Sequence, residues 1–170
     1  HILGGNGNPS AHYKYSNGVW VSVSTLPYTF YYGDAVVLDG EIHILGGSAN
    51  SSAHYKYSNG TWINVSTIPC GFRYSSAIVL DNEIHILGDA DYFTKHYKYS
   101  NGAWVIVSIL PYELRQGDAV VLDGEIHILG GTMGSDGRTN PGRYHYKYSN
   151  GAWVNGGTLP YEFYYGSAVV

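Results

Sequence analysis

The chain has 170 residues, of which 44% are hydrophobic, 15% are aromatic and only 13% are charged. This composition excludes a disordered chain, which would carry more charge and fewer aromatic side chains. No apolar run approaches the ~20 residues of a membrane-spanning helix, and a net charge of −4 argues against a nucleic-acid partner. The single cysteine, Cys70, cannot form an internal disulfide and leaves the redox compartment undecided.

A repeat covers the whole chain. The sequence His-Ile-Leu-Gly begins at positions 1, 43, 85 and 127, a constant spacing of 42 residues. The sequence His-Tyr-Lys-Tyr-Ser-Asn-Gly begins at 12, 54, 96 and 145, so the last repeat carries seven additional residues. Both ends cut through a repeat, so we expect a fragment of a longer protein. We divide the single domain 1–170 into units 1–32, 33–74, 75–116 and 117–165, with 166–170 as an inner strand that completes or begins a blade.

The second unit illustrates the four strands that we expect in each repeat. An apolar run at 35–38 ends in Asp-Gly, a strand at 41–45 ends in Gly-Gly, one at 54–58 ends in Asn-Gly, and the last spans 62–66. Asp-Gly and Asn-Gly between alternating runs are strong hairpin signals because both turn residues adopt positive φ. No stretch of useful length has helical spacing, so the sequence predicts an all-β fold.

A four-stranded antiparallel sheet of this length cannot bury both of its faces alone. Repeating the sheet around an axis lets each sheet cover the next, and the result is a β-propeller. A linear β-solenoid is the alternative, although such repeats are usually shorter and parallel. We therefore predict four propeller blades of 42 residues or slightly more.

Each unit also contains an apolar strand, a glycine doublet, a tyrosine and, seven residues after that tyrosine, a tryptophan. The doublets lie at 4–5, 46–47 and 130–131, whereas the third unit has Gly88-Asp89. The tyrosine and tryptophan pairs are Tyr13 and Trp20, Tyr55 and Trp62, Tyr97 and Trp104, and Tyr146 and Trp153. This pattern resembles the kelch repeat over essentially the whole chain. The resemblance implies four-stranded antiparallel blades whose first strand lies innermost, in rings that commonly have six or seven blades.

Four kelch-type units can form a ring in two ways. They belong to a larger ring, completed by further repeats or by self-association with another chain. Alternatively, they form a four-bladed ring in which the C-terminal strand 168–170 completes the sheet that begins at 1–3 and removes an exposed edge.

Comparison of the units predicts one constant and one variable face. The Asp-Gly and Asn-Gly turns share a face and barely change. The loops between second and third strands and the connections between units share the opposite face, the variable rim, where aromatic and arginine side chains differ between units. Phe30, Phe72, Leu114 and Phe163 recur there, and we expect them to pack the blade tops. The candidate ligand-binding residues on the variable rim are Tyr31, Tyr32, Arg73, Tyr74, Tyr92, Arg115, Gln116, Arg138, Tyr164 and Tyr165.

The sequence gives little support to a metal site or a cofactor. The histidines recur at the same places in every unit, which favours a structural role, and a spacing of 42 residues is expected to put each histidine on a different blade rather than in one cluster. Asp34 and Asp118 enter the innermost strands where other units have Ser76 and Ser167, and they are weak candidates for a cation site near the axis. Capping of the strand start is the simpler interpretation. We expect no metal and no cofactor.

The sequence therefore predicts a non-catalytic recognition module that binds a protein or a glycan through the variable rim. The amino-acid sequence of the repeat is similar to kelch-like segments of bacterial surface and phage tail proteins, which favours glycan or cell-surface recognition outside the cell. The alternatives are an adaptor propeller that binds a peptide and a fragment of a kelch-type carbohydrate-active enzyme. For the enzyme, Cys70 near Tyr74 on the variable rim would be the feature to examine, but no paired carboxylate site supports catalysis.

Overall fold

The computed structural model describes residues 1–89, 91, 94–132 and 142–170, and within these residues it contains strands and no helix. All strand pairings are antiparallel and neighbouring strands follow one another in the chain. The first sheet has three strands and the other three sheets have four strands each. The sheets consist of β1–β3 (Ile2–Leu3, Ala11–Ser16, Val19–Thr25), β4–β7 (Asp34–Leu38, Glu41–Leu45, Ala53–Ser58, Thr61–Thr67), β8–β11 (Ser76–Leu80, Glu83–Leu87, Lys95–Ser100, Ala103–Ile109) and β12–β15 (Asp118–Leu122, Glu125–Leu129, Tyr144–Ser149, Ala152–Thr158).

The predicted turns form the hairpins. In the second sheet, Asn59 and Gly60 have φ values of 49° and 84°, and Asp39 and Gly40 have φ values of 51° and 77°. Two consecutive positive φ angles define the tight hairpin turn that matches the twist of the flanking strands. Asn and Asp tolerate this conformation better than other residues with a side chain, and Gly adopts it without cost. The all-β prediction is confirmed, and the expected four strands are found in the last three sheets, whereas the first sheet has three.

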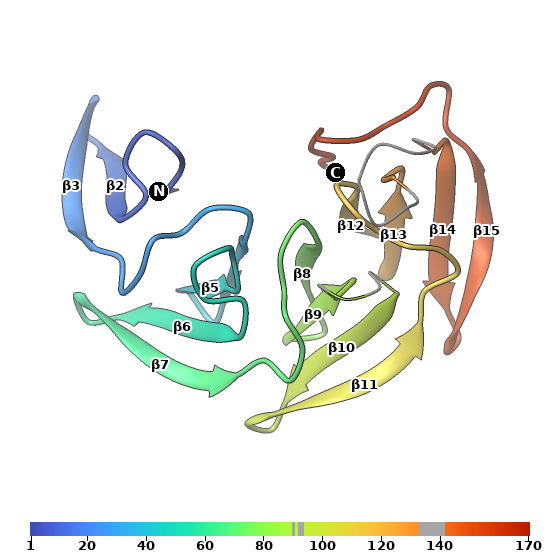
Figure 1. Cartoon of the computed structure of the whole chain (residues 1–170), viewed down its shortest axis with the longest axis horizontal. Coiled ribbons are helices and arrows are strands. Elements are labelled where there is room, and N and C mark those ends of the chain that lie inside the picture. The colour runs from blue at the N-terminus through green and yellow to red at the C-terminus, as the bar shows by residue number, and fades with distance from the viewer. Residues whose placement is uncertain (90, 92–93, 133–141) are drawn as a thin grey trace.

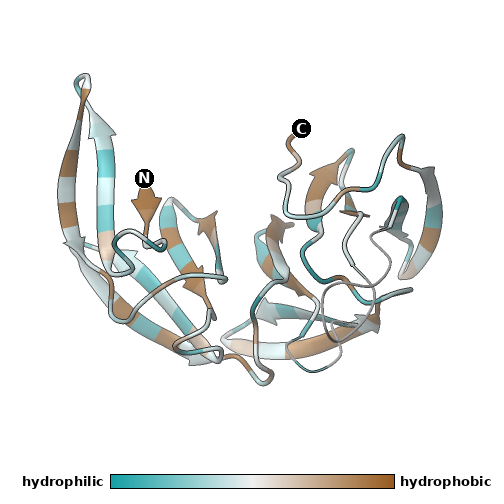
Figure 2. Ribbon diagram, turned by 45° about the horizontal axis from the view of Figure 1, so that its top comes forward, coloured by the Kyte–Doolittle hydropathy of each residue, from teal (hydrophilic) through white to brown (hydrophobic). Residues whose placement is uncertain are grey.

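The four sheets fan around a common centre in a propeller-like arrangement (Figure 1). The first strands of the last three sheets, β4, β8 and β12, lie innermost and contact one another in the order β4, β8, β12. The fourth strands lie at the periphery (Figure 1). Apolar and polar residues alternate along the strands (Figure 2). Because successive side chains point to opposite faces of a sheet, each sheet presents an apolar face to its neighbour.

The cores lie between neighbouring sheets. Between the second and third sheets, Phe72, Ile84 and Ile86 are fully buried together with Leu45 and Ile68. A corresponding cluster between the third and fourth sheets contains buried Leu114, Ile126 and Ile128. Because each core is built from two sheets, we expect that no repeat is stable by itself, as in other stacked repeats.

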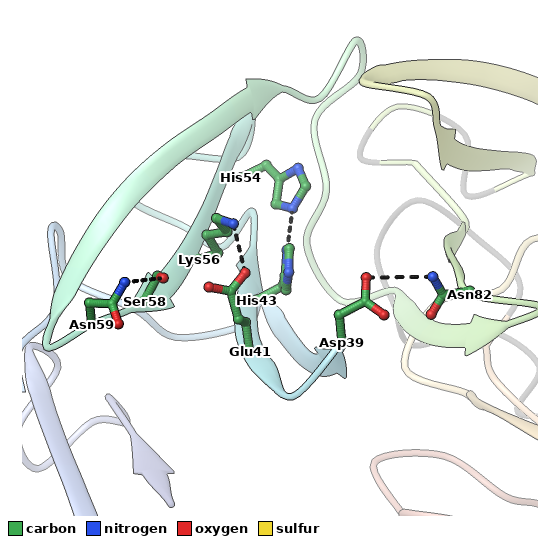
Figure 3. A network of polar contacts seen from close by, with 8 residues as sticks. All are labelled: Asp39, Glu41, His43, His54, Lys56, Ser58, Asn59 and Asn82. Carbon is green, nitrogen blue, oxygen red and sulfur yellow. Dashed lines mark hydrogen bonds and ion pairs between the residues drawn. The ribbon is translucent and has the colours of Figure 1, made fainter.

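A polar relay crosses each of the three interfaces between neighbouring sheets. In the second sheet, His43 Nδ1 lies 2.8 Å from His54 Nε2 (Figure 3), and His54 Nδ1 lies 2.8 Å from Ser66 Oγ. Trp104 of the third sheet donates its indole N–H to the same Ser66 hydroxyl at 3.0 Å. The other two interfaces repeat the final contact, from Trp62 to Ser24 and from Trp153 to Ser108.

The relay corrects one expectation about the histidines. Equivalent histidines do lie on different sheets, but the two histidines within each unit lie side by side. The hairpin register pairs Leu45 with His54 and His43 with Lys56, which makes His43 and His54 diagonal neighbours on one face. Their facing ring nitrogens share a hydrogen bond, and the structural role that we predicted for them takes this form.

The ring closure through the C-terminal strand is not shown. Residues 166–170 form no strand, and β1 pairs only with β2. The first and last sheets stand apart in both views (Figures 1 and 2). The C-terminal segment is hydrogen-bonded to the fourth sheet: Tyr165 donates its backbone N–H to Gln116 O, and Ala168 donates its own to Asp118 Oδ2. Val169 and Val170 remain 91% and 78% exposed.

Candidate ligand-binding site

Four equivalent residues of the variable rim converge near the centre of the arc. Tyr32, Tyr74, Gln116 and Tyr165 each directly precede the start of an innermost segment. Together with the small residues that follow them, Gly33, Ser75, Gly117 and Gly166, they line a cavity of about 230 Å³, the axial pocket. All four were among the candidate residues from the sequence.

The backbone at these four positions is strained. Tyr32, Tyr74, Gln116 and Tyr165 have φ values of 62°, 58°, 60° and 53°. Positive φ is uncommon in residues other than Gly, Asn and Asp, and outliers of this kind cluster at ligand sites. Here hydrogen bonds between sheets hold the conformation: the backbone N–H of each of the last three residues donates to the carbonyl of the residue before it in the series, at 3.0 Å from Tyr74 to Tyr32 and at 2.8 Å in the next two steps.

The side chains of the axial pocket form an aromatic surface with polar edges. The rings of Tyr32 and Tyr74 lie 4.5 Å apart between centroids, with an interplanar angle of 35°. The guanidinium carbon of Arg115 lies 5.0 Å from the centroid of the Tyr74 ring, a cation–π distance. Gln116 donates from Nε2 to the Tyr165 hydroxyl at 2.5 Å. Burial raises the pKa of Tyr74, so its hydroxyl stays protonated at neutral pH and can both donate and accept.

Asp34 and Asp118, which lie beside the axial pocket, link neighbouring sheets through hydrogen bonds. Asp34 accepts the N–H of Ala77 at 2.8 Å and that of its own neighbour Ala35 at 2.7 Å. Asp118 accepts from Ser76 Oγ, Ala119 N and Ala168 N at 3.0, 2.8 and 2.7 Å. Burial raises the pKa of Asp34 to about 6. These contacts match the capping interpretation, and the described residues contain no group of three His, Cys, Asp or Glu side chains that could hold a metal ion.

The other candidate residues lie around the axial pocket or apart from it. Tyr31 lines an adjoining hollow of about 310 Å³ with Tyr32 and Phe30. Arg73 and Tyr164 are exposed, and the Tyr164 ring lies 5.9 Å from that of Tyr165. Tyr92 and Arg138 fall outside the residues that the structure describes.

The expected packing of the blade tops holds for three of its four residues. Phe72 and Leu114 are fully buried, Phe30 is nearly so, and Phe163 is half-buried.

Cys70 does not lie on the variable rim, which corrects the expectation from the sequence. It is buried in the core between the second and third sheets with Phe72, Ile84 and Tyr97. Burial, with a smaller contribution from Asp89, raises the pKa of the thiol to about 11. A protonated, buried thiol is a poor nucleophile and a poor metal ligand. The sequence placed Cys70 by its neighbours in the chain, but this connection turns its side chain inward.

A third cavity, also of about 310 Å³, was not predicted from the sequence. We call it the fourth-sheet pocket. Its signal was present in the sequence as a cluster of departures from the repeat, which the comparison of units did not weigh. The residues that line it are Gly142, Arg143, Tyr144, Tyr146, Asn155, Gly157, Thr158 and Glu162.

The comparisons with known proteins bear on the fold alone. No family model and no curated protein sequence matches the chain, and in the part of the chain that the structure describes no helix is long and apolar enough to cross a membrane. Among solved structures, that of YjhT is similar, with a TM-score of 0.68 and 16% sequence identity over 79% of this chain and 53% of YjhT. The chain thus spans about half the length of YjhT. At this identity the likeness supports the propeller-like arrangement of the sheets.

Proposed function

We propose that the chain is a non-catalytic recognition module of kelch type, whose ligand binds at the variable rim over the axial pocket. One observation carries the proposal. Four units that otherwise repeat closely place Tyr32, Tyr74, Gln116 and Tyr165 in strained backbone around one cavity. A purely structural ring would place Gly, Asn or Asp at such positions, as the hairpin turns of this chain do, because these residues tolerate positive φ best.

A glycan suits the axial pocket better than a peptide. The paired rings of Tyr32 and Tyr74 offer flat apolar faces, and the Tyr hydroxyls and the Gln116 amide both donate and accept hydrogen bonds. A sugar presents the same combination of an apolar ring face and a hydroxyl edge. A glycan ligand also fits the resemblance of the repeat to kelch-like segments of surface and phage tail proteins. That resemblance favours a location of the protein outside the cell.

The ring to which the blades belong is a larger one in this proposal. The C-terminal segment carries the sequence of an innermost strand and already makes the two contacts that link each inner strand to the preceding sheet. A further blade, from the same polypeptide or from another copy, would then continue the arc.

A glycan array and a peptide pulldown, each run with the wild-type chain and with Tyr74→Ala, test the proposal. Retention of specific glycans that Tyr74→Ala releases would support it. Tyr15→Ala is the matched control, since Tyr15 is an exposed tyrosine of β2 that is not a residue of the variable rim and does not line the axial pocket. Capture of a peptide instead would assign the adaptor function, and binding that Tyr74→Ala leaves unchanged would remove the axial pocket from consideration.

A further inference from the structure

The fourth-sheet pocket lies where the fourth unit departs from the other three. Arg143 stands where the others have Ser10, Ser52 and Thr94. Tyr144 stands where they have Ala11, Ala53 and Lys95. On the outer strand β15, Gly156 and Gly157 replace a valine and a serine that the first three units share. The residues replaced there are Val23, Val65 and Val107 for Gly156, and Ser24, Ser66 and Ser108 for Gly157.

Three of these four departures line the pocket, and the fourth lies next to it. Arg143, Tyr144 and Gly157 line it directly. Gly156 lets the His145 ring approach the outer strand, because a Cβ at position 156 would lie 2.7 Å from the ring. The two glycines remove side chains from one wall while Tyr144 adds a ring to another. Substitutions spread over two strands of one unit thus converge on a single cavity.

Tyr144 builds an aromatic wall that the first two units lack. Its ring lies 4.8 Å from that of Tyr112, which in turn lies 5.7 Å from Tyr146. Between the first two sheets, the equivalent Tyr28 ring lies 5.8 Å from that of Tyr55 and 6.1 Å from that of Phe30, and its hydroxyl donates to Gly46 O at 2.8 Å. The equivalent hydroxyl of Tyr112 is buried and has no hydrogen-bond partner within the described residues. The interface between the third and fourth sheets therefore lacks this hydrogen bond at the place where it gains the aromatic wall.

The polar lining identifies the chemical class of the ligand. Arg143 and Glu162 balance one another in charge, which disfavours an anion or a cation. Asn155 and Thr158 each carry groups that both donate and accept hydrogen bonds. A wholly apolar ligand would leave these groups desolvated without partners, at a cost. The volume of about 310 Å³ is at the lower end of the range for small-molecule sites.

We propose that the fourth-sheet pocket is a binding site for a neutral sugar ring, which stacks on Tyr144 and Tyr146 and bonds through its hydroxyls to Asn155, Thr158 and Glu162. Arg143 is a positioning residue: its Nε donates to Leu159 O at 2.6 Å and fixes the rim of the pocket. The site shares no residue with the axial pocket. The proposal for one pocket can therefore be wrong while the proposal for the other holds.

NMR titration of the whole chain with the methyl glycosides of glucose, galactose and N-acetylglucosamine tests this proposal. At least one glycoside is expected to shift the amide signals of Tyr144, Asn155 and Gly157 in the millimolar range. Tyr144→Ala, which restores the residue of the first two units, is expected to weaken binding at least tenfold, and so is Asn155→Ala.

Asn64→Ala is the matched control, since Asn64 occupies the equivalent position in the second unit, and it should leave binding unchanged. Tyr74→Ala should also leave it unchanged, because Tyr74 belongs to the axial pocket. Should no glycoside shift these signals, or should Tyr144→Ala and Asn155→Ala bind as the wild type does, the proposal is wrong. Shifts produced by N-acetyltryptophanamide but by none of the sugars would assign the pocket to an aromatic peptide side chain and also overturn it.

Discussion

Trp104 of the third sheet donates its indole N–H to the hydroxyl of Ser66 in the second sheet at 3.0 Å. Because an indole can only donate, Ser66 accepts this bond and can pass its own hydrogen to His54 Nδ1, which lies 2.8 Å away. His54 then donates from Nε2 to His43 Nδ1. With this order of donors, every polar atom from the Trp104 indole N–H to His43 Nδ1 has a hydrogen-bond partner.

Replacement of Ser66 by Ala is expected to destabilise the chain by about 1–3 kcal/mol, because the indole N–H of Trp104 and the ring of His54 both lose a part-buried partner. Urea denaturation followed by tryptophan fluorescence measures the loss. Ser58→Ala is the control, since Ser58 lies outside the relay: its hydroxyl accepts a long, exposed bond of 3.5 Å from Asn59 and bonds to the partly exposed carboxylate of Glu41. Equal midpoints for the two variants would show that the relay does not stabilise the interface.

Stability is expected to fall as the pH is lowered from about 6.5 towards 4. Burial lowers the pKa of His54 and of His96 to about 3, from an ordinary value of 6.5. In this range the unfolded chain binds protons that the folded chain does not, so acid favours unfolding. Asp34 works in the opposite direction, because its folded pKa of about 6 makes the folded chain the better proton binder between about pH 4 and 6.

Two histidines with large shifts outweigh one aspartate with a smaller shift, so the net effect is a loss of stability in acid. Urea midpoints measured at several pH values between about 8 and 5 would show it. The double variant His54→Gln, His96→Gln should flatten the dependence. A midpoint in the wild type that stays constant over this range would contradict the assignment.

Gly46→Ala is expected to cost at least about 2 kcal/mol more than Gly60→Ala. Both residues have positive φ, 58° and 84°, so both variants carry the ~1–2 kcal/mol penalty of a side chain in this conformation. Only at Gly46 would the new Cβ meet a backbone atom, Phe72 O at 2.1 Å, whereas nothing lies within 4 Å of a Cβ at Gly60. Thermal unfolding of the two variants compares them directly, and similar losses would mean that the connection at Phe72 shifts without cost.

Asp118→Ala is expected to speed hydrogen exchange at the Ala168 amide and to lower stability by about 2–3 kcal/mol, because the carboxylate accepts charge-assisted bonds from Ser76, Ala119 and Ala168. Asp39→Asn is the control for loss of a carboxylate, because Asp39 is exposed, contacts Asn82 at a long 3.5 Å, and has a φ of 51° that Asn tolerates and Ala does not. Unchanged exchange at Ala168 in Asp118→Ala would show that Asp118 does not hold the C-terminal segment.

The fold could largely be predicted from the sequence, whereas parts of the candidate ligand-binding site could not. Hairpins such as the one at Asn59-Gly60 depend on local backbone preferences, and these act over a few residues. The convergence of Tyr32, Tyr74, Gln116 and Tyr165 was predictable only in outline, as shared membership of the variable rim. Cys70 was misplaced, because the inward turn of its connection depends on packing against Ile84 and Ile86 of the next sheet.

The sequence by itself determined the strands, the turns, the repeat and the need for each sheet to be covered by another, since all of these follow from residue spacing and short-range conformational preference. Only the tertiary structure decided the pairing of His43 with His54, the axial pocket, and the convergence of Tyr144 with Gly157 on one cavity. These depend on hairpin register and on contacts between segments far apart in the chain, which no local pattern specifies.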